Sequence, residues 1–272
     1  MKVSPAHFTA TPEGFLPSQY AQGRWGPDQL NGPAIVGLAA HCLEHDHGSA
    51  DFQPARLTVD LFKAARGRLT TVRTRLIRDG RRIRNAECDV VQDDVVVARA
   101  TLVLYRRSAP PPGEQWSASI DFAFPQDLDS SQDPPHPHTG SAGGGWSRKI
   151  SDHQNNTRTK FVDRSINVLS GQQNSPFVRA AVVAEATSLV THLGTRGVGY
   201  INGDLTVALT RLPVEEWIGV QEDTHWAADG VSVGTATLFD SAGPFGSGMV
   251  TAIANPDAQL DFSAETFDGV SL

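Results

Sequence analysis

Residues 200–211 read YINGDLTVALTR and set an acid, Asp204, at the mouth of a strand. From Leu205 to Thr210, Leu and Val alternate with Thr and Ala, the period-2 pattern of a strand with one buried face. The Asn-Gly-Asp run before this strand is also ordinary turn composition. Asp204 is therefore either a functional carboxylate or a residue that caps the strand.

A helix is predicted immediately upstream, over residues 175–193. Ser175 is the expected N-cap, Pro176 suits the first helical position, and Gly194 is the expected stop. Most faces of this helix are apolar. We therefore expect other elements to enclose it on several sides.

The motif L-T-V-x-L-x-[KR] occurs twice, at 57–63 and at 205–211. Each copy follows a predicted helix and precedes three strand-like runs. The helices are expected at 31–45 and 175–193, and the strands at 68–78, 82–91 and 95–105 and again at 217–227, 231–239 and 245–254. This repetition predicts an α+β protein of two repeats, each with a sheet curled around a central helix, joined edge to edge into one antiparallel sheet.

The composition changes between Ser108 and Gly145, where Pro, Gly, Ser and Asp occur without apolar periodicity. Such a stretch buries too little apolar surface to offset the entropy of ordering, so it is a predicted linker. The expected division is a repeat at 1–107, a linker at 108–145 and a repeat at 146–272. Within the linker, only residues 116–124 (WSASIDFAF) are expected to dock on the repeats.

Overall composition excludes some classes of function. The formal net charge is −7 and hydrophobic residues make up 39% of the 272, which favours a globular protein and disfavours a nucleic-acid partner. There is no apolar run long enough to insert into a membrane and no signal-like N-terminus. Cys42 and Cys88 are expected to be buried thiols in a reducing compartment, which points to the cytoplasm. His136 and His138 lack a third ligand, so no metal site is expected.

Taken in order, residues 23–44, 56–105 and 200–244 resemble the double-hotdog acyl-CoA thioesterases, the type II family, and in particular the branch common in actinobacteria. The resemblance extends from about residue 5 to 255 and is weakest in the linker. It implies a double hotdog fold and hydrolysis of a fatty acyl-CoA by an activated water, in lipid metabolism. It further implies no cofactor and a homodimer or higher homo-oligomer.

In this family an Asp, a Thr or Ser, and a Gln hold the water. The Asp position matches Asp204, a possible general base. The Thr position matches Thr224, whose hydroxyl can orient a water and whose strand is expected beside that of Asp204. The Gln position falls near Val250 or Thr251. The sequence has no Gln between Gln221 and Gln259, so Thr251 is the expected substitute.

Substrate-binding candidates lie on the two helices. Hotdog enzymes resemble one another in presenting the N-terminus of a central helix to the thioester carbonyl, which matches Asn31 and Gly32; Asn-Gly-Pro is equally ordinary helix-start chemistry. Glu185 is the sole ionisable residue between Arg179 and His192. It is expected either to face the substrate or to pair with an arginine.

Eight arginines occur between residues 66 and 84, several of them two apart, so they share one face of a strand. This strip either meets the phosphates of coenzyme A or is the solvated face of the sheet.

Two other functions remain open. A catalytically weakened protein that binds acyl-CoA or an acyl chain would also lack the Gln. A hotdog hydratase would need an Asp followed five residues later by His, and neither Asp28 nor Asp204 has one.

Overall fold

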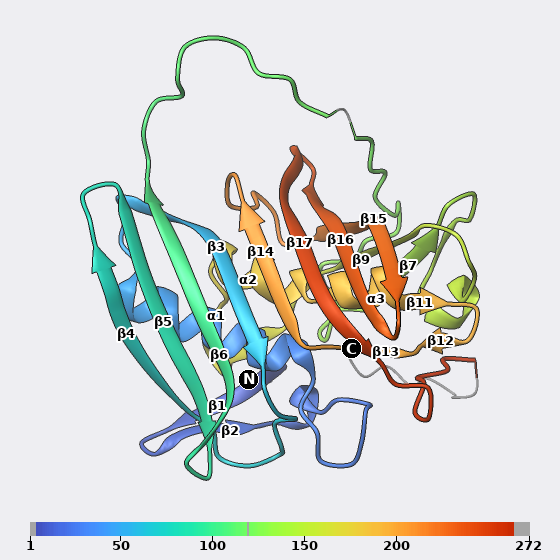
Figure 1. The fold of residues 1–272 in the computed structure, drawn as a ribbon, viewed down its shortest axis with the longest axis horizontal. Coiled ribbons are helices and arrows are strands. Elements are labelled where there is room, and N and C mark those ends of the chain that lie inside the picture. The colour runs from blue at the N-terminus through green and yellow to red at the C-terminus, as the bar shows by residue number, and fades with distance from the viewer. Residues whose placement is uncertain (1–3, 119, 264–272) are drawn as a thin grey trace.

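Both halves of the chain contribute strands to one twelve-stranded sheet (Figure 1), in a computed structural model that describes residues 4–118 and 120–263. Residues 1–3 and 264–272, at the ends of the two predicted repeats, and Ser119 in the segment expected to dock lie outside the described residues. The strands of the first half are β3 (Phe52–Leu61), β4 (Thr71–Asp79), β5 (Ile83–Gln92) and β6 (Val95–Arg106). Those of the second half are β7 (His138–Ser141), β8 (Trp146–Ser147), β9 (Thr159–Asp163), β13 (Tyr200–Asn202), β14 (Asp204–Leu209), β15 (Ile218–Ala228), β16 (Val231–Asp240) and β17 (Gly243–Ala254).

The two halves join where the repeated motif pairs with itself. The order along the sheet is β4-β5-β6-β3-β14-β17-β16-β15-β9-β7-β8, with β13 beside β17, and every pairing is antiparallel. At the β3–β14 seam, Thr58 lies opposite Thr206, and their hydroxyls are 3.0 Å apart. The predicted edge-to-edge joining of two repeats into an α+β fold is confirmed.

Three helices lie against one face of this sheet (Figure 1): α1 (Gly32–His47), α2 (Pro176–Ala184) and α3 (Ala186–His192). The Asn31 and Ser175 side chains accept the N–H groups of Ala34 and Val178, which confirms Ser175 as an N-cap. The prediction of one helix over 175–193 is wrong. Glu185 donates its N–H to the carbonyl of Val182, one residue closer than in a regular α-helix, and this divides α2 from α3.

A small second sheet, order β10-β1-β2, was not expected. It consists of β1 (Ala6–Thr11), β2 (Gly14–Pro17) and β10 (Asn167–Leu169). Strands β1 and β10 pair in parallel, so the expectation of antiparallel pairing throughout holds for the large sheet and fails here. The sequence signal was weak because β1 and β2 are short and lie in a Pro- and Gly-containing stretch.

The structure has a strand within the predicted linker. Residues 107–118 and 120–137 leave the sheet as a long arch (Figure 1), but His138 begins strand β7, is 2% exposed, and is paired with β9. Its His-Thr-Gly-Ser sequence carries no apolar alternation that could have indicated a strand. The docking prediction is confirmed for Phe122, which stacks on Phe239 with ring centres 4.6 Å apart, whereas Trp116 is 90% exposed.

Among the described helices, none is both long and apolar enough to cross a membrane.

Candidate active site

A cavity of about 530 Å³ lies where the first turn of α1 meets the junction of α2 and α3. It is lined by three of the residues predicted from the sequence, Asn31, Gly32 and Glu185. Asn202 and Asp163 also line it. Most of the remaining wall is apolar. An enclosed apolar space with a few convergent polar groups is the usual form of a small-molecule site.

The carboxylate of Glu185 lies directly against the start of α1. A Cβ atom placed on Gly32 would be only 2.1 Å from Glu185 Oε1. In this first turn the Ala34 N–H donates to the Asn31 side chain, and Pro33 has no N–H. The Gly32 N–H is therefore the backbone donor of the turn that remains for a substrate. The site therefore combines a carboxylate with the partial positive charge of a helix N-terminus.

Burial dominates the electrostatics of Glu185. Desolvation raises its pKa to about 7, opposed by a hydrogen bond from Asn202 Nδ2 to Glu185 Oε1 at 3.3 Å. A carboxyl group whose pKa lies near neutrality can accept a proton during a reaction and release it afterwards. No arginine pairing of Glu185 occurs among the described residues, so the pairing alternative is not supported.

Asp204 and Thr251 are in contact, but outside this cavity. The Thr251 N–H donates to Asp204 Oδ1 at 2.8 Å, and the Thr251 hydroxyl donates to Oδ2. Both neighbours of Thr251, Val250 and Ala252, are buried on the helix side of the sheet, so the Asp204–Thr251 pair lies on the opposite face. Neither residue of the pair lines the cavity.

Thr224 is not where the strand argument placed it. Strands β17 and β16 separate β15 from β14, so the expectation that the Thr224 strand lies beside the Asp204 strand is wrong. Its hydroxyl is 2.7 Å from that of Thr235, and it lines a second, more open cleft. Alternation of apolar and polar residues indicates a strand but not its position in the sheet. Here β17, the last strand of the chain, lies next to β14.

The sequence interpretation missed several polar cavity residues, among them His7, Asp163, Ser165 and Asn202. Asp163 ends β9, a strand that was not predicted, and burial raises its pKa to about 7. An acid directly after an apolar pair, in TKFVD, is the signal that could have indicated it.

Both cysteines are free and buried, as expected. Burial raises the pKa of each thiol to about 12, so neither is a thiolate near neutral pH.

Four of the eight arginines in the strip pair with neighbouring acids, Arg73 with Asp94 at 3.8 Å among them. Arg68 pairs with Asp93, Arg75 with Glu87, and Arg84 with Asp79. This favours the solvated-face interpretation of the strip. In the described part of the chain, no group of three His, Cys, Asp or Glu side chains could hold a metal ion.

Solved structures similar to this chain share its architecture. A tesB protein of Mycobacterium avium subspecies paratuberculosis superposes with a TM-score of 0.61 at 14% identity, covering 92% of this chain and 96% of its own. A protein of unknown function with a hot dog fold from Alicyclobacillus acidocaldarius gives 0.66 at 15%, covering 92% and 96%. An acyl-CoA thioesterase II, TesB2, from Mycobacterium marinum gives 0.59 at 15%, covering 83% and 91%. No curated protein matches the sequence. The fold is a double hotdog.

Two family models match adjacent parts of the sequence. The acyl-CoA thioesterase N-terminal domain matches residues 21–105, and the acyl-CoA thioesterase C-terminal domain matches residues 106–252. The chain belongs to the acyl-CoA thioesterase family, as the resemblance implied, and it hydrolyses acyl-CoA thioesters. The division at 1–107, 108–145 and 146–272 stays a prediction.

Proposed function

We propose that the acyl-CoA thioester is hydrolysed in the cavity between Gly32 and Glu185. The observation that carries this is the Glu185 carboxylate against the N-terminus of α1. There a base for water and a donor for the developing oxyanion lie together in an apolar enclosure, where electrostatic interactions are stronger than in water.

In this mechanism the thioester carbonyl accepts the Gly32 N–H. Glu185 removes a proton from a water as its oxygen attacks the thioester carbon, and the negative charge develops on the carbonyl oxygen. The tetrahedral intermediate then expels the thiolate of coenzyme A, which takes up the proton held by Glu185. Asn202 fixes the carboxylate through its amide.

The set of Asp204, Thr224 and Thr251 is the alternative for the water-holding role, and it stays a prediction. Three observations weigh against it: Thr251 engages both carboxylate oxygens of Asp204, the pair lies outside the cavity, and Thr224 is on a distant strand. The missing Gln does not affect the proposed site, because neither Gly32 nor Glu185 depends on it.

The pH dependence of kcat/KM should report the base. A base must be ionised to act, and the pKa of Glu185 is about 7, so log kcat/KM is expected to rise with unit slope below pH 7 and to level above it. Asp163, in the same cavity, also has a pKa of about 7, so Asp163→Asn is the matched control and should retain the inflection. A flat profile from pH 5.5 to 8.5, a range of about three units, would exclude Glu185 as the base.

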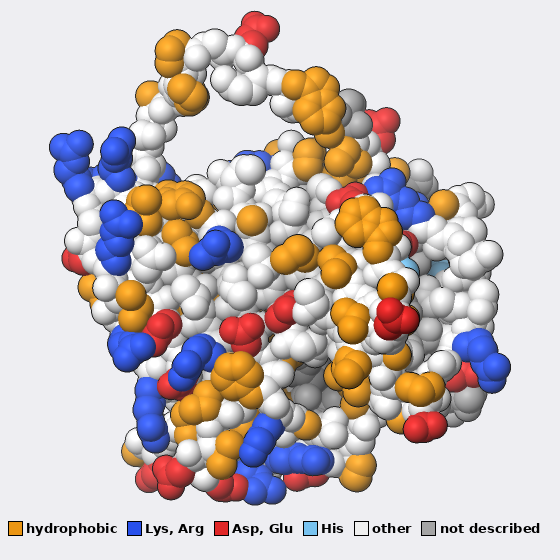
Figure 2. All heavy atoms as spheres, viewed as in Figure 1, with side chains coloured by type: hydrophobic (Ala, Val, Ile, Leu, Met, Phe, Trp, Pro, Cys, Tyr) orange, Lys and Arg blue, Asp and Glu red, His pale blue; other side chains and the backbone are white. Residues whose placement is uncertain are grey.

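We also propose that the chain forms a homodimer or a larger homo-oligomer. An apolar row crosses three strands of the outer face of the sheet: Ile201 and Val231 both lie opposite Ile253, and the three are 38%, 56% and 64% exposed. Figure 2 shows apolar groups on this face between charged ones. Light scattering at micromolar concentration should give at least twice the 29.2 kDa of one chain, and a mass of one chain would contradict the proposal.

A cytoplasmic location is compatible with the two free thiols and is likewise a proposal.

A further inference from the structure

Three polar residues that line the cavity, His7, Asp163 and Ser165, have no role in the proposed hydrolysis, and we call them its polar wall. Asp163, the last residue of β9, and Ser165, in the connection from β9 to β10, line this wall. The parallel pairing of β1 with β10 brings His7 to the same part of the cavity, because Ala6 and Phe8 lie opposite Asn167 and Leu169.

His7 offers an unused acceptor there. Its Nδ1 is 3.2 Å from the carbonyl oxygen of Tyr20, and since a carbonyl only accepts, Nδ1 carries the hydrogen. Burial lowers the pKa of His7 to about 4, so the ring is neutral and Nε2 is a bare acceptor. The side chain is 1% exposed, and Nε2 has no hydrogen-bond partner in the described part of the chain.

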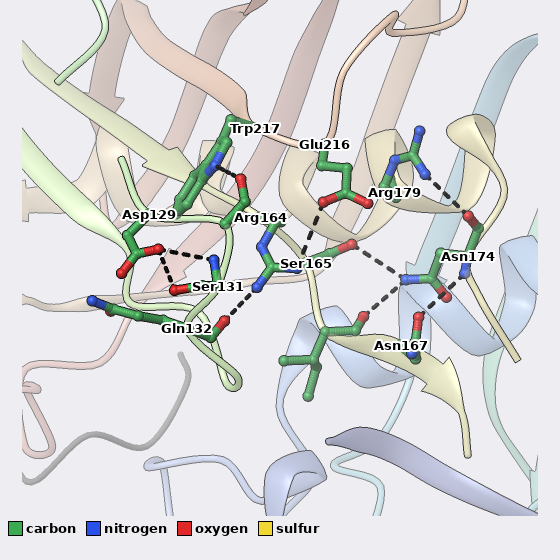
Figure 3. Close-up of polar contacts among 12 residues, drawn as sticks. Asp129, Ser131, Gln132, Arg164, Ser165, Asn167, Asn174, Arg179, Glu216 and Trp217 are labelled. Carbon is green, nitrogen blue, oxygen red and sulfur yellow. Dashed lines mark hydrogen bonds and ion pairs between the residues drawn. The ribbon is translucent and has the colours of Figure 1, made fainter. Parts of the chain in front are cut away.

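Asp163 and Ser165 offer donors. The raised pKa of Asp163 leaves a large share of its carboxyl protonated near neutral pH, and its Oδ1 accepts the Arg164 N–H at 2.8 Å. The Arg164 guanidinium does not form a salt bridge with it: it binds the Gln132 carbonyl and pairs with Glu216 at 3.6 Å (Figure 3). Ser165 Oγ accepts from Asn174 at 3.2 Å, so its own hydrogen remains available.

The connection that carries Ser165 is held in place by hydrogen bonds. Asn174 holds the connection through its side chain, donating to the carbonyl of Ile166 and accepting from the N–H of Val168, each at 2.8 Å. Arg179 in turn donates to the Asn174 carbonyl at 3.2 Å. A buried polar group without a hydrogen-bond partner destabilises the folded protein. If the group is held rigidly, this destabilisation lasts until a ligand supplies the missing hydrogen bond.

We propose that His7, Asp163 and Ser165 bind a hydroxyl group on the acyl chain, so that the enzyme selects hydroxyacyl-CoA over unsubstituted acyl-CoA. A hydroxyl can donate to His7 Nε2 while it accepts from Asp163 or Ser165. It therefore provides a partner both for the acceptor and for a donor of the polar wall. The inference rests on the proposed function, since it places the acyl group in the same cavity as Glu185.

The test compares kcat/KM for octanoyl-CoA, 3-hydroxyoctanoyl-CoA and 8-hydroxyoctanoyl-CoA. At least one hydroxylated substrate should be preferred by about tenfold or more, because a site that binds a hydroxyl rejects the analogue without it. His7→Phe and Asp163→Leu should bring this ratio close to one while octanoyl-CoA is still hydrolysed. Asp257→Leu, at an exposed acid, is the matched control and should keep the preference. The proposal would be overturned if the unmodified enzyme showed no preference for a hydroxylated substrate. It would also be overturned if the preference were the same in both variants as in the unmodified enzyme.

A binding measurement separates this inference from the proposed mechanism. Titration calorimetry on the Glu185→Gln variant compares free octanoate with the two hydroxyoctanoates, independently of turnover. Tighter binding of a hydroxyoctanoate, lost in the double variant with His7→Phe, supports the polar wall even if another residue is the base. Equal binding of all three acids would contradict the proposal that the polar wall binds a hydroxyl. The role of Glu185 would still be tested separately, by the pH dependence of kcat/KM.

Discussion

Glu185→Gln is expected to lower kcat for an acyl-CoA by about 10² to 10⁴ while KM changes little. The amide matches the carboxylate in size and can still accept the hydrogen bond of Asn202, but it cannot take a proton from water. Because the interaction lost belongs to the transition state, the effect should appear in kcat. Release of free coenzyme A thiol over a series of chain lengths is the measurement.

Asp204→Asn is the matched control, since it makes the same change of carboxylate to amide on the other face of the sheet. We expect it to alter kcat by less than about threefold, apart from any loss of stability from the Thr251 hydrogen bonds. Thermal unfolding of both variants, followed by circular dichroism, separates the two effects. If Asp204→Asn abolishes turnover and Glu185→Gln does not, water is activated at Asp204 and the cavity mechanism is wrong.

Gly32→Ala is expected to lower kcat by about 10² to 10³, the usual effect of losing one oxyanion donor. The new methyl group would lie 2.1 Å from Glu185 Oε1 and 2.5 Å from its Cδ. The carboxylate must therefore move away from the helix N-terminus, and the carbonyl of the substrate can no longer approach the N–H. The same thiol-release assay measures the effect.

Gly203→Ala is the control for this second prediction. Its Cβ would meet nothing closer than the Thr251 carbonyl at 3.9 Å, although it stands next to Asp204. Activity should stay within about threefold of the unmodified enzyme. Full activity in Gly32→Ala would show that the thioester carbonyl is bound elsewhere.

The sequence was sufficient where a pattern was local. The repeated Leu-Thr-Val motif predicted two equivalent halves, and the structure pairs the two copies through Thr58 and Thr206. The isolated acid on an apolar helix, Glu185, and the Asn31–Gly32 helix start were also apparent from composition, and the structure brings them into one cavity.

What the sequence could not provide was the order of elements separated along the chain. The place of Thr224 depends on which strand inserts beside β14, and alternation carries no such information. Likewise, His7 and Asp163 are 156 positions apart and share a wall because β1 pairs with β10. Short strands with weak patterns, such as β7 and β9, were hidden by their polar composition.

The arch of residues 107–118 and 120–137 connects two halves that are already held together by strand pairing. Strands β3 and β14 join them across the large sheet, and β1 and β10 join them across the small one. A protease that cut the arch would therefore leave two fragments still assembled as one particle, with Gly32 on one fragment and Glu185 on the other. The covalent link is thus a tether that sets the local concentration of two complementary pieces, and the reaction centre belongs to neither piece alone.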